Sequence, residues 1–285
     1  MNQSNLWSLR LGFSGKQSQK INSIGIEKFL KESFYAPFEN KIPYCLIEDP
    51  KTLSELKDFR EKVKNTTSEE GKKALKNQIK NSIELRKWWI NEIQKQEFPL
   101  REKMVLFWHN HFVSTSQKVK VNWWIYQHNQ ILRENAFGNF RQLTKIMIQT
   151  NAMVRYLDNT DNRKGKINEN LSRELSELFT LGIGNYTESD IKNGAKALAG
   201  LGLGENEAKY RAFFEDNDTI TYLGKTGNFK ANDLVDIIFE QPICESTENT
   251  HFEPDTENPK VDSEPDTENP DTEKPLTENP KQINT

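Results

Sequence analysis

A proline recurs every five or six residues near the C-terminus, and this repeat limits what that part of the chain can fold into. The pentapeptide Asp-Thr-Glu-Asn-Pro at 255–259 returns unchanged at 266–270 and continues in looser copies up to Pro280. Proline lacks an N–H and clashes with the preceding turn, so a helix cannot run through this repeat. The polar residues also bury too little apolar surface to offset the entropy lost on ordering. We therefore predict a disordered, acidic, proline-rich tail at 245–285 and a folded domain at 1–244.

The predicted tail and the predicted domain carry opposite charges. The tail holds twelve Asp and Glu against three Lys, a formal charge of −9, which leaves +6 on residues 1–244. We expect the tail to solubilise or loosely screen the domain. Nucleic-acid binding favours a clustered basic face, and a mild excess of +6 argues against it. The sequence leaves the partner open, with a protein or a polysaccharide as candidates.

Composition excludes two further classes of protein. Hydrophobic residues make up 34% of the chain and charged residues 28%, and no apolar run approaches the ~20 residues of a membrane-spanning helix. Two cysteines, Cys45 and Cys244, are too few for a disulfide scaffold. The N-terminus lacks the basic and then apolar segments of a secretory signal, so the sequence as written indicates a cytoplasmic protein.

The domain has the periodicity of a mainly α fold with several helices. In the longest predicted helix, Leu75, Ile79 and Ile83 recur at helical spacing and are expected to face the core. Thr187, with Asp190 three residues later, is typical of a helix N-terminus. The predicted helices are 25–35, one that begins at Thr52, 72–96, 100–111, 121–135, 140–150, 168–181, 187–201 and 233–240.

A small β excursion near 208–224 interrupts this helical pattern. The segments 210–214 and 219–223 read as short strands that could pair as a hairpin. Strands do not alternate with helices elsewhere, so the sequence does not indicate a parallel α/β sheet. The predicted fold class is therefore mainly α, with this one excursion and the disordered tail.

Several ordered motifs resemble one bacterial family. The strongest is Asn-Glu-Asn-Leu-Ser-Arg-Glu-Leu-Ser-Glu-Leu-Phe-Thr-Leu-Gly at 168–182. The others lie at 9–13, 101–104, 107–112, 135–141, 156–159 and 186–190. Together they resemble the family catalogued as domain of unknown function 1800, over about residues 6–243.

This resemblance implies little chemistry, because the family has no established activity. Many of its members look exported, which contrasts with the N-terminus read here. Members are also longer, so the resemblance implies a truncated member that ends after about residue 243. The family often shows a His-Asp pair near 216–218, where this sequence has Asp216-Asn217-Asp218 and no histidine.

His109 and His111 are candidate metal ligands because imidazole nitrogens bind divalent metals. On a helix the two rings would point about 200° apart and could not share an ion. If the helix ended near Trp108, both rings could converge on one divalent metal, which would then be the cofactor. The alternative is that one histidine packs in the core and hydrogen-bonds a carboxylate.

Glu169, Arg173 and Glu177 share one face of the predicted helix 168–181, and Glu174 lies about 100° away. In a cleft, two of these carboxylates held by Arg173 could act as general acid and base. These four residues are therefore candidate catalytic residues. The alternative is a solvated row of ion pairs.

The sequence leaves the function open between different classes, and whether the chain is an enzyme remains undecided. One hypothesis is a metal- or acid/base-dependent, hydrolase-like cleft that joins His109 and His111 to the helix carrying Glu169–Glu177. The second is a noncatalytic binding or scaffold module. The adjacent pairs Trp88-Trp89 and Trp123-Trp124 fit either carbohydrate stacking or core packing. The third is an inactive fragment.

Overall fold

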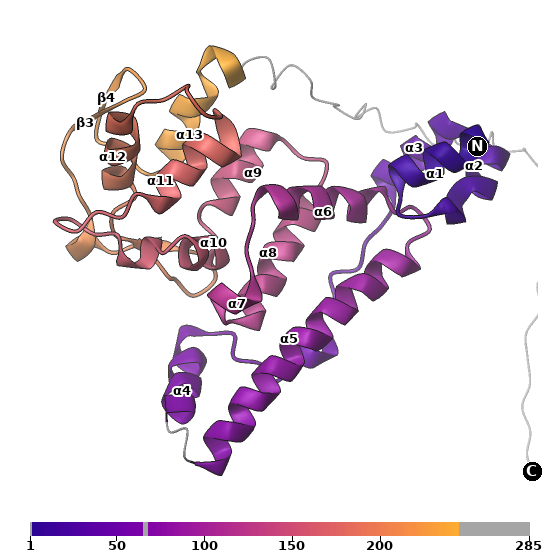
Figure 1. The fold of residues 1–285 in the computed structure, drawn as a ribbon, viewed down its shortest axis with the longest axis horizontal. Helices are drawn as coiled ribbons and strands as arrows, with labels where there is room; N and C mark the ends of the chain where they lie inside the picture. Colours follow the sequence, from indigo (N-terminus) through magenta and orange to yellow (C-terminus); the bar gives the residue numbers. More distant parts are fainter. Residues whose placement is uncertain (1, 65–67, 245–285) are drawn as a thin grey trace, which may run out of the picture. The chain divides into compact units, whose positions relative to one another are not determined.

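The computed structural model describes residues 2–64 and 68–244 (Figure 1). The described part is mainly helical with two small two-stranded sheets, which confirms the predicted fold class. The predicted disordered tail at 245–285 lies outside the described residues. Within the described ranges, every helix is too short or too polar to cross a lipid bilayer.

The N-terminal helices form where apolar residues recur every three or four positions. Gly25, with φ of +83°, separates α2 from α3, because a left-handed backbone there ends one helix and redirects the chain into the next. Phe29 of α3 is fully buried and packs on Phe98, with ring centroids 5.2 Å apart. The elements are α1 (Gln3–Leu11), η1 (Gly15–Gln17), α2 (Ser18–Ile24), α3 (Ile26–Tyr35) and η2 (Tyr44–Leu46).

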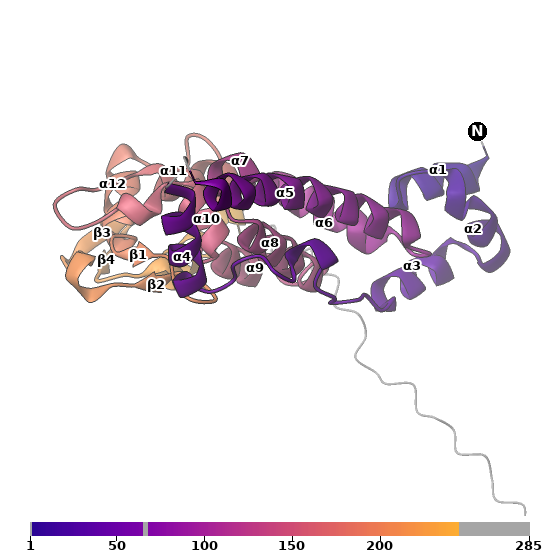
Figure 2. The same ribbon diagram turned by 90° about the horizontal axis from the view of Figure 1, so that it is seen from below.

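The middle of the chain supplies the helices that later form the site. Helix α8 packs against both α5 and α6, and α4 packs against α5 (Figures 1 and 2). The segment is α4 (Leu53–Lys64), α5 (Glu69–Lys95), α6 (Leu100–His111), α7 (Ser116–Val119) and α8 (Asn122–Glu134). The residues predicted as helices 100–111 and 121–135 thus match α6 and α8 to within a residue.

Helix α5 was expected to turn Leu75, Ile79 and Ile83 inward, and this expectation is wrong. These side chains are 39%, 56% and 45% exposed, whereas Leu85 is buried. Leu85 lies two residues after Ile83, about 200° around the helix. The neighbours of α5 therefore cover the side opposite the longest apolar row.

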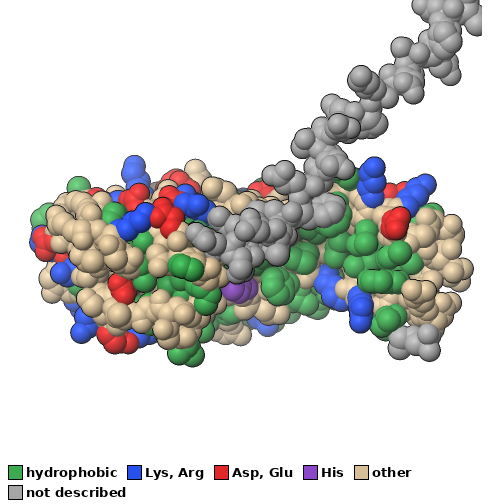
Figure 3. Space-filling model, turned by 90° about the horizontal axis from the view of Figure 1, so that it is seen from above, with side chains coloured by type: hydrophobic (Ala, Val, Ile, Leu, Met, Phe, Trp, Pro, Cys, Tyr) green, Lys and Arg blue, Asp and Glu red, His purple; other side chains and the backbone are tan. Residues whose placement is uncertain are grey.

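On the face shown in Figure 3, Lys and Arg side chains are scattered among acidic and apolar ones.

The C-terminal half contains the largest apolar core, which joins side chains of α6 and α8 to those of the later helices. The predicted helix 168–181 is present but changes type, because α11 continues into a π-helix. Thr187 and Asp190 form the predicted reciprocal cap of α12. The helices are α9 (Phe140–Met147), α10 (Asn151–Tyr156), η3 (Asn159–Asp161), α11 (Asn170–Glu174), η4 (Leu175–Thr180), α12 (Glu188–Ala197), η5 (Ala212–Phe214) and α13 (Ala231–Phe239).

The β excursion is confirmed, but its strands pair differently from the expected hairpin. Strand β1 (Leu201–Gly202) pairs with β2 (Lys209–Tyr210), and β3 (Ile220–Tyr222) pairs with β4 (Lys225–Gly227), all antiparallel. Leu223 and Gly224 both have positive φ, so they form the two-residue turn that folds β3 onto β4. A leucine at positive φ is uncommon, which is why the sequence did not signal this turn.

Replacing Gly194 with alanine is expected to lower the free energy of unfolding by about 1–3 kcal/mol. A Cβ on this α12 residue would lie 2.4 Å from Ser172 Oγ and 3.0 Å from Tyr222 Cε2, and all three residues are buried. Gly15→Ala is the matched control, because its Cβ would meet no atom within 4 Å. Urea unfolding of both variants checks the prediction, and equal midpoints would contradict it.

Candidate functional site

The structure places His109 and His111 on opposite sides of α6, because the helix continues through both residues. His111 Nε2 lies 2.9 Å from Phe179 O. Since a carbonyl only accepts, Nε2 carries the proton and caps the last turn of the π-helix. The two rings therefore do not converge. Among residues 2–64 and 68–244, no group of three or more His, Cys, Asp or Glu side chains is placed to hold a metal ion.

Three of the four candidates, Glu169, Arg173 and Glu177, pair with neighbouring side chains at a partly exposed surface. Arg173 contacts Glu169 at 3.1 Å and Glu188 at 2.8 Å, an arrangement that corresponds to the solvated row of ion pairs. Glu177 accepts a 2.5 Å hydrogen bond from the Tyr186 hydroxyl, which raises the pKa of that tyrosine. The pKa of the Glu174 carboxyl is raised first by burial and then by the charge of Glu177.

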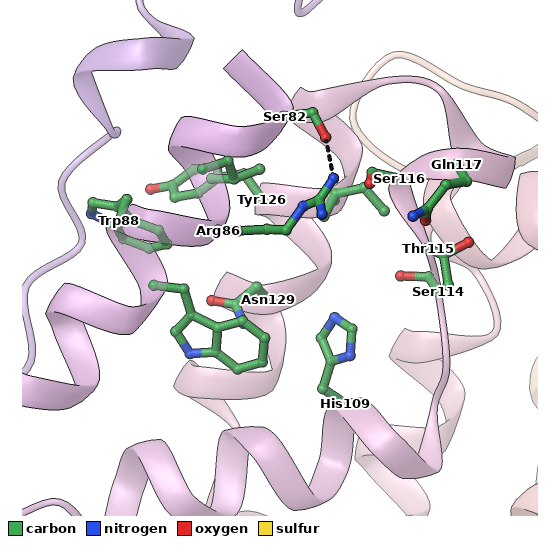
Figure 4. Close-up of a pocket in the computed structure, with 13 residues that line it drawn as sticks. Ser82, Arg86, Trp88, His109, Ser114, Thr115, Ser116, Gln117, Tyr126 and Asn129 are labelled. Carbon is green, nitrogen blue, oxygen red and sulfur yellow. Dashed lines mark hydrogen bonds between the residues drawn. The ribbon is translucent and has the colours of Figure 1, made fainter. Parts of the chain in front are cut away.

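A cavity of about 260 Å³ opens between α5, α6 and α8 (Figure 4). His109 lies in this cavity, and every other lining residue also falls between positions 82 and 129. The cavity and the four candidate residues at 169–177 are therefore separate features. The lining residues are Ser82, Leu85, Arg86, Trp88, Trp89, His109, Ser114, Thr115, Ser116, Gln117, Ile125, Tyr126 and Asn129.

His109 is held between aromatic rings and a second histidine. Its ring centroid lies 5.2 Å from that of Trp89 on α5 and 5.4 Å from that of His128 on α8. Burial lowers the pKa of His109 below the usual value of about 6.5. Near pH 7 the imidazole of His109 is therefore neutral, so it retains a ring nitrogen that can accept a proton.

His128 stands behind His109 and is fully buried. Its Nε2 donates to Phe112 O at 2.8 Å, so the neutral ring presents a bare Nδ1. Nδ1 has no hydrogen-bond partner among the described residues. Burial, and then the nearby His109, lowers the pKa of His128 to about 3. The histidine pair is consequently uncharged at neutral pH.

Two buried polar atoms of the cavity lining lack a protein partner in the described part of the chain. They are Ser114 Oγ and Asn129 Nδ2, and the two residues are only 3% and 5% exposed. Asn129 Oδ1 accepts a 2.7 Å hydrogen bond from Arg133 Nη2, and arginine can only donate. This contact fixes the orientation of the amide and leaves its N–H groups unpaired. Buried polar groups normally have partners, which a bound water or a polar group of a ligand would supply here.

A buried ion pair lies next to the cavity and contacts two of its lining residues, Asn129 and Trp89. Arg133 of α8 binds Glu102 of α6 through Nε to Oε1 at 2.6 Å and Nη2 to Oε2 at 3.0 Å, and both side chains are at most 3% exposed. The Trp89 indole N–H donates to Glu102 Oε2 at 3.0 Å. One network therefore orients both the Asn129 amide and the Trp89 ring. Sequence reasoning assigned no role to Glu102, Asn129 or Arg133, although Glu102 lies in one of the family-like motifs.

Aromatic side chains complete one wall of the cavity. Trp88 packs on Tyr126 with ring centroids 5.6 Å apart, and the Arg133 guanidinium lies 5.5 Å from the Trp88 ring. Trp88 and Trp89 are both half-buried and both line the cavity. Helix α5 therefore presents both rings of this pair to the same cavity.

Comparison with known proteins identifies the family. A family described as "Protein of unknown function (DUF1800)" matches residues 6–247. No curated protein and no solved structure matches the chain. The chain therefore belongs to the DUF1800 family, as the motifs predicted.

Proposed function

We propose that this DUF1800 member binds a small organic molecule in the α5–α6–α8 cavity and that His109 acts on it as a general base. The observation that carries this proposal is the pair of unpartnered polar atoms, Ser114 Oγ and Asn129 Nδ2, in the same cavity as His109. A bound molecule with a polar group would satisfy both atoms, whose burial without a partner otherwise costs about 1–3 kcal/mol each.

The chemistry that suits this arrangement is hydrolysis. Neutral His109 would take a proton from water as the water oxygen attacks a bound ester or related carbonyl, and would return it to the leaving oxygen. The Ser114 hydroxyl and the Asn129 N–H groups would donate hydrogen bonds to the substrate oxygen as it gains charge. Glu169, Arg173, Glu174 and Glu177 lie outside this set, and we assign the Arg173 pairs a structural role.

An assay of 4-nitrophenyl acetate hydrolysis tests the proposal, with the released 4-nitrophenol as the measured product. We expect His109→Gln to lower kcat/KM by about a hundredfold or more, the usual contribution of a general base. His111→Gln is the matched control, since the same substitution two residues away alters a ring outside the cavity. Glu174→Gln should leave the rate unchanged. Equal rates for the wild type and His109→Gln would contradict the assignment.

The pH dependence gives a second readout. A base with a lowered pKa is half-protonated only below the usual histidine value of about 6.5, so the midpoint of the fall in kcat/KM on the acid side should lie below pH 6.5. A rate that already declines between pH 8 and 7 would show that another group is the base.

A noncatalytic binding module is the second candidate, and the aromatic wall of Trp88, Trp89 and Tyr126 favours it. Such a protein would bind its ligand through ring stacking and the same polar atoms without turning it over. Saturable binding in the cavity together with no turnover of any tested ester would establish this candidate and exclude the catalytic one.

A further inference from the structure

We infer that the ligand of the α5–α6–α8 cavity is the sugar ring of an acidic saccharide. This inference rests on the proposed function, because it specifies the class of molecule that the same cavity takes. The cavity lining supports it, because this lining consists of an aromatic wall, a neutral polar wall and one cationic side chain (Figure 4).

The aromatic wall fits the apolar face of a pyranose. Trp88 and Trp89 on α5 and Tyr126 on α8 bring three rings to one side of the cavity. A pyranose presents C–H groups on its faces, and these pack on aromatic rings. The planes of the Trp88 and Tyr126 rings meet at 66°, so the rings form an angled apolar wall on which such a face can pack. The hydrogen bond from the Trp89 N–H to Glu102 keeps one of these rings in place.

The opposite wall supplies hydrogen bonds without charge. Ser114, Thr115 and Gln117 lie across the cavity from Trp88 and Tyr126 in Figure 4, and they belong to one continuous run, 114–117, of hydroxyl and amide side chains. A sugar carries a rim of hydroxyl groups around its apolar faces, and hydroxyl groups both donate and accept. This wall therefore complements the rim of a sugar, whereas a purely apolar ring would leave its polar atoms unpaired.

Arg86 adds the preference for an acid. Its guanidinium extends between the two walls, where Nη2 lies 3.4 Å from Ser82 Oγ (Figure 4). The lining contains no Asp or Glu side chain among the described residues. A carboxylate on the sugar would pair with the planar guanidinium in the two-pronged geometry that arginine favours. His109 is neutral, so it faces a hydroxyl rather than the acid group.

Calorimetric titration of the whole protein with three probes tests this inference. The probes are methyl β-D-glucuronide, methyl β-D-glucoside and benzoate, which is an acid with a planar ring but no hydroxyl rim. We expect the glucuronide to bind about tenfold more tightly than the glucoside, which in turn binds more tightly than benzoate. Arg86→Gln should remove the difference between the two glycosides, and Lys87→Gln, the same change of charge at the next residue, should preserve it.

Two further variants address the walls of the cavity. We expect each of the variants Trp88→Leu and Gln117→Ala to lower the affinity for both glycosides roughly three- to tenfold. Gln117 is exposed, so its variant provides this evidence even if the Trp88 variant fails to fold. Benzoate binding as tightly as the glycosides would overturn the sugar assignment, and equal binding of the two glycosides would overturn the acid preference.

The failures of the two proposals can be distinguished. If His109-dependent hydrolysis of 4-nitrophenyl acetate occurs while neither glycoside binds, the saccharide inference is wrong and the proposed function stands. If neither hydrolysis nor binding of any probe occurs, both are wrong.

Discussion

Replacing Arg133 with methionine is expected to lower the free energy of unfolding by about 3–5 kcal/mol. Arg133 and Glu102 are at most 3% exposed and are joined by two hydrogen bonds. Removing the guanidinium leaves the Glu102 carboxylate buried without its charge partner, which costs more than the loss of an exposed pair. Equilibrium urea unfolding, with the slope of the transition compared between variants, measures this difference.

Arg173→Met is the matched control for this experiment. Arg173 binds two carboxylates, where Arg133 binds one, but its side chain is 35% exposed, so its loss should change stability by at most about 1 kcal/mol. The double variant Glu102→Met/Arg133→Met should lose less stability than the two single variants together, because it leaves neither charge alone. Similar losses in Arg133→Met and Arg173→Met would contradict the buried network.

Mild acid is expected to destabilise the protein through His128. Its pKa is about 3 in the folded protein, against about 6.5 in an unfolded chain. Between these values the unfolded chain binds more protons, so stability is fully present above pH 6.5 and is lost as the pH falls below it. Proton uptake at this one site removes about 2 kcal/mol between pH 6.5 and 4.5. Thermal or urea unfolding at a series of pH values measures the loss.

The variant His128→Gln isolates this contribution. Glutamine does not titrate, and its amide retains an N–H donor for Phe112 O, which His128 bonds at 2.8 Å. Its stability should therefore fall by about 2 kcal/mol less than that of the wild type over the same pH range. His111→Gln should change the dependence less, because His111 is only partly buried. Identical pH dependence in the wild type and His128→Gln would rule out the buried neutral histidine.

The helices could be predicted because their signals are local. The proline at position 99, which favours a helix start, and the cap at Thr187 and Asp190 each act within a few residues, and both predicted helices are confirmed. The inward face of α5 could not be predicted in the same way. Both sides of this helix carry apolar residues, and only the positions of α4, η2 and α8 decide that Leu85 rather than Ile83 is covered.

In the candidate site, too, the features with a local sequence signal could be predicted, and those that depend on helix packing could not. The two-residue spacing of His109 and His111 predicted that, on a helix, the rings would point apart, and they do. Ser114 and Asn129 match no spacing motif, because their role depends on the contact of α8 with α5 and α6. The link from Glu102 to Arg133 spans 31 residues and joins different helices, so it gives no periodic signal.

The measurement that tests the central claim most directly is a nuclear magnetic resonance titration of the ¹⁵N-labelled protein at pH 7, with methyl β-D-glucuronide and with benzoate. The account predicts that His109 is neutral in the free protein. It also predicts that the more tightly bound probe shifts the His109 ring and Asn129 side-chain amide signals with one common dissociation constant, while the His111 signals stay in place. A protonated His109, or signals of His109 and Asn129 that move with neither probe, would contradict the account.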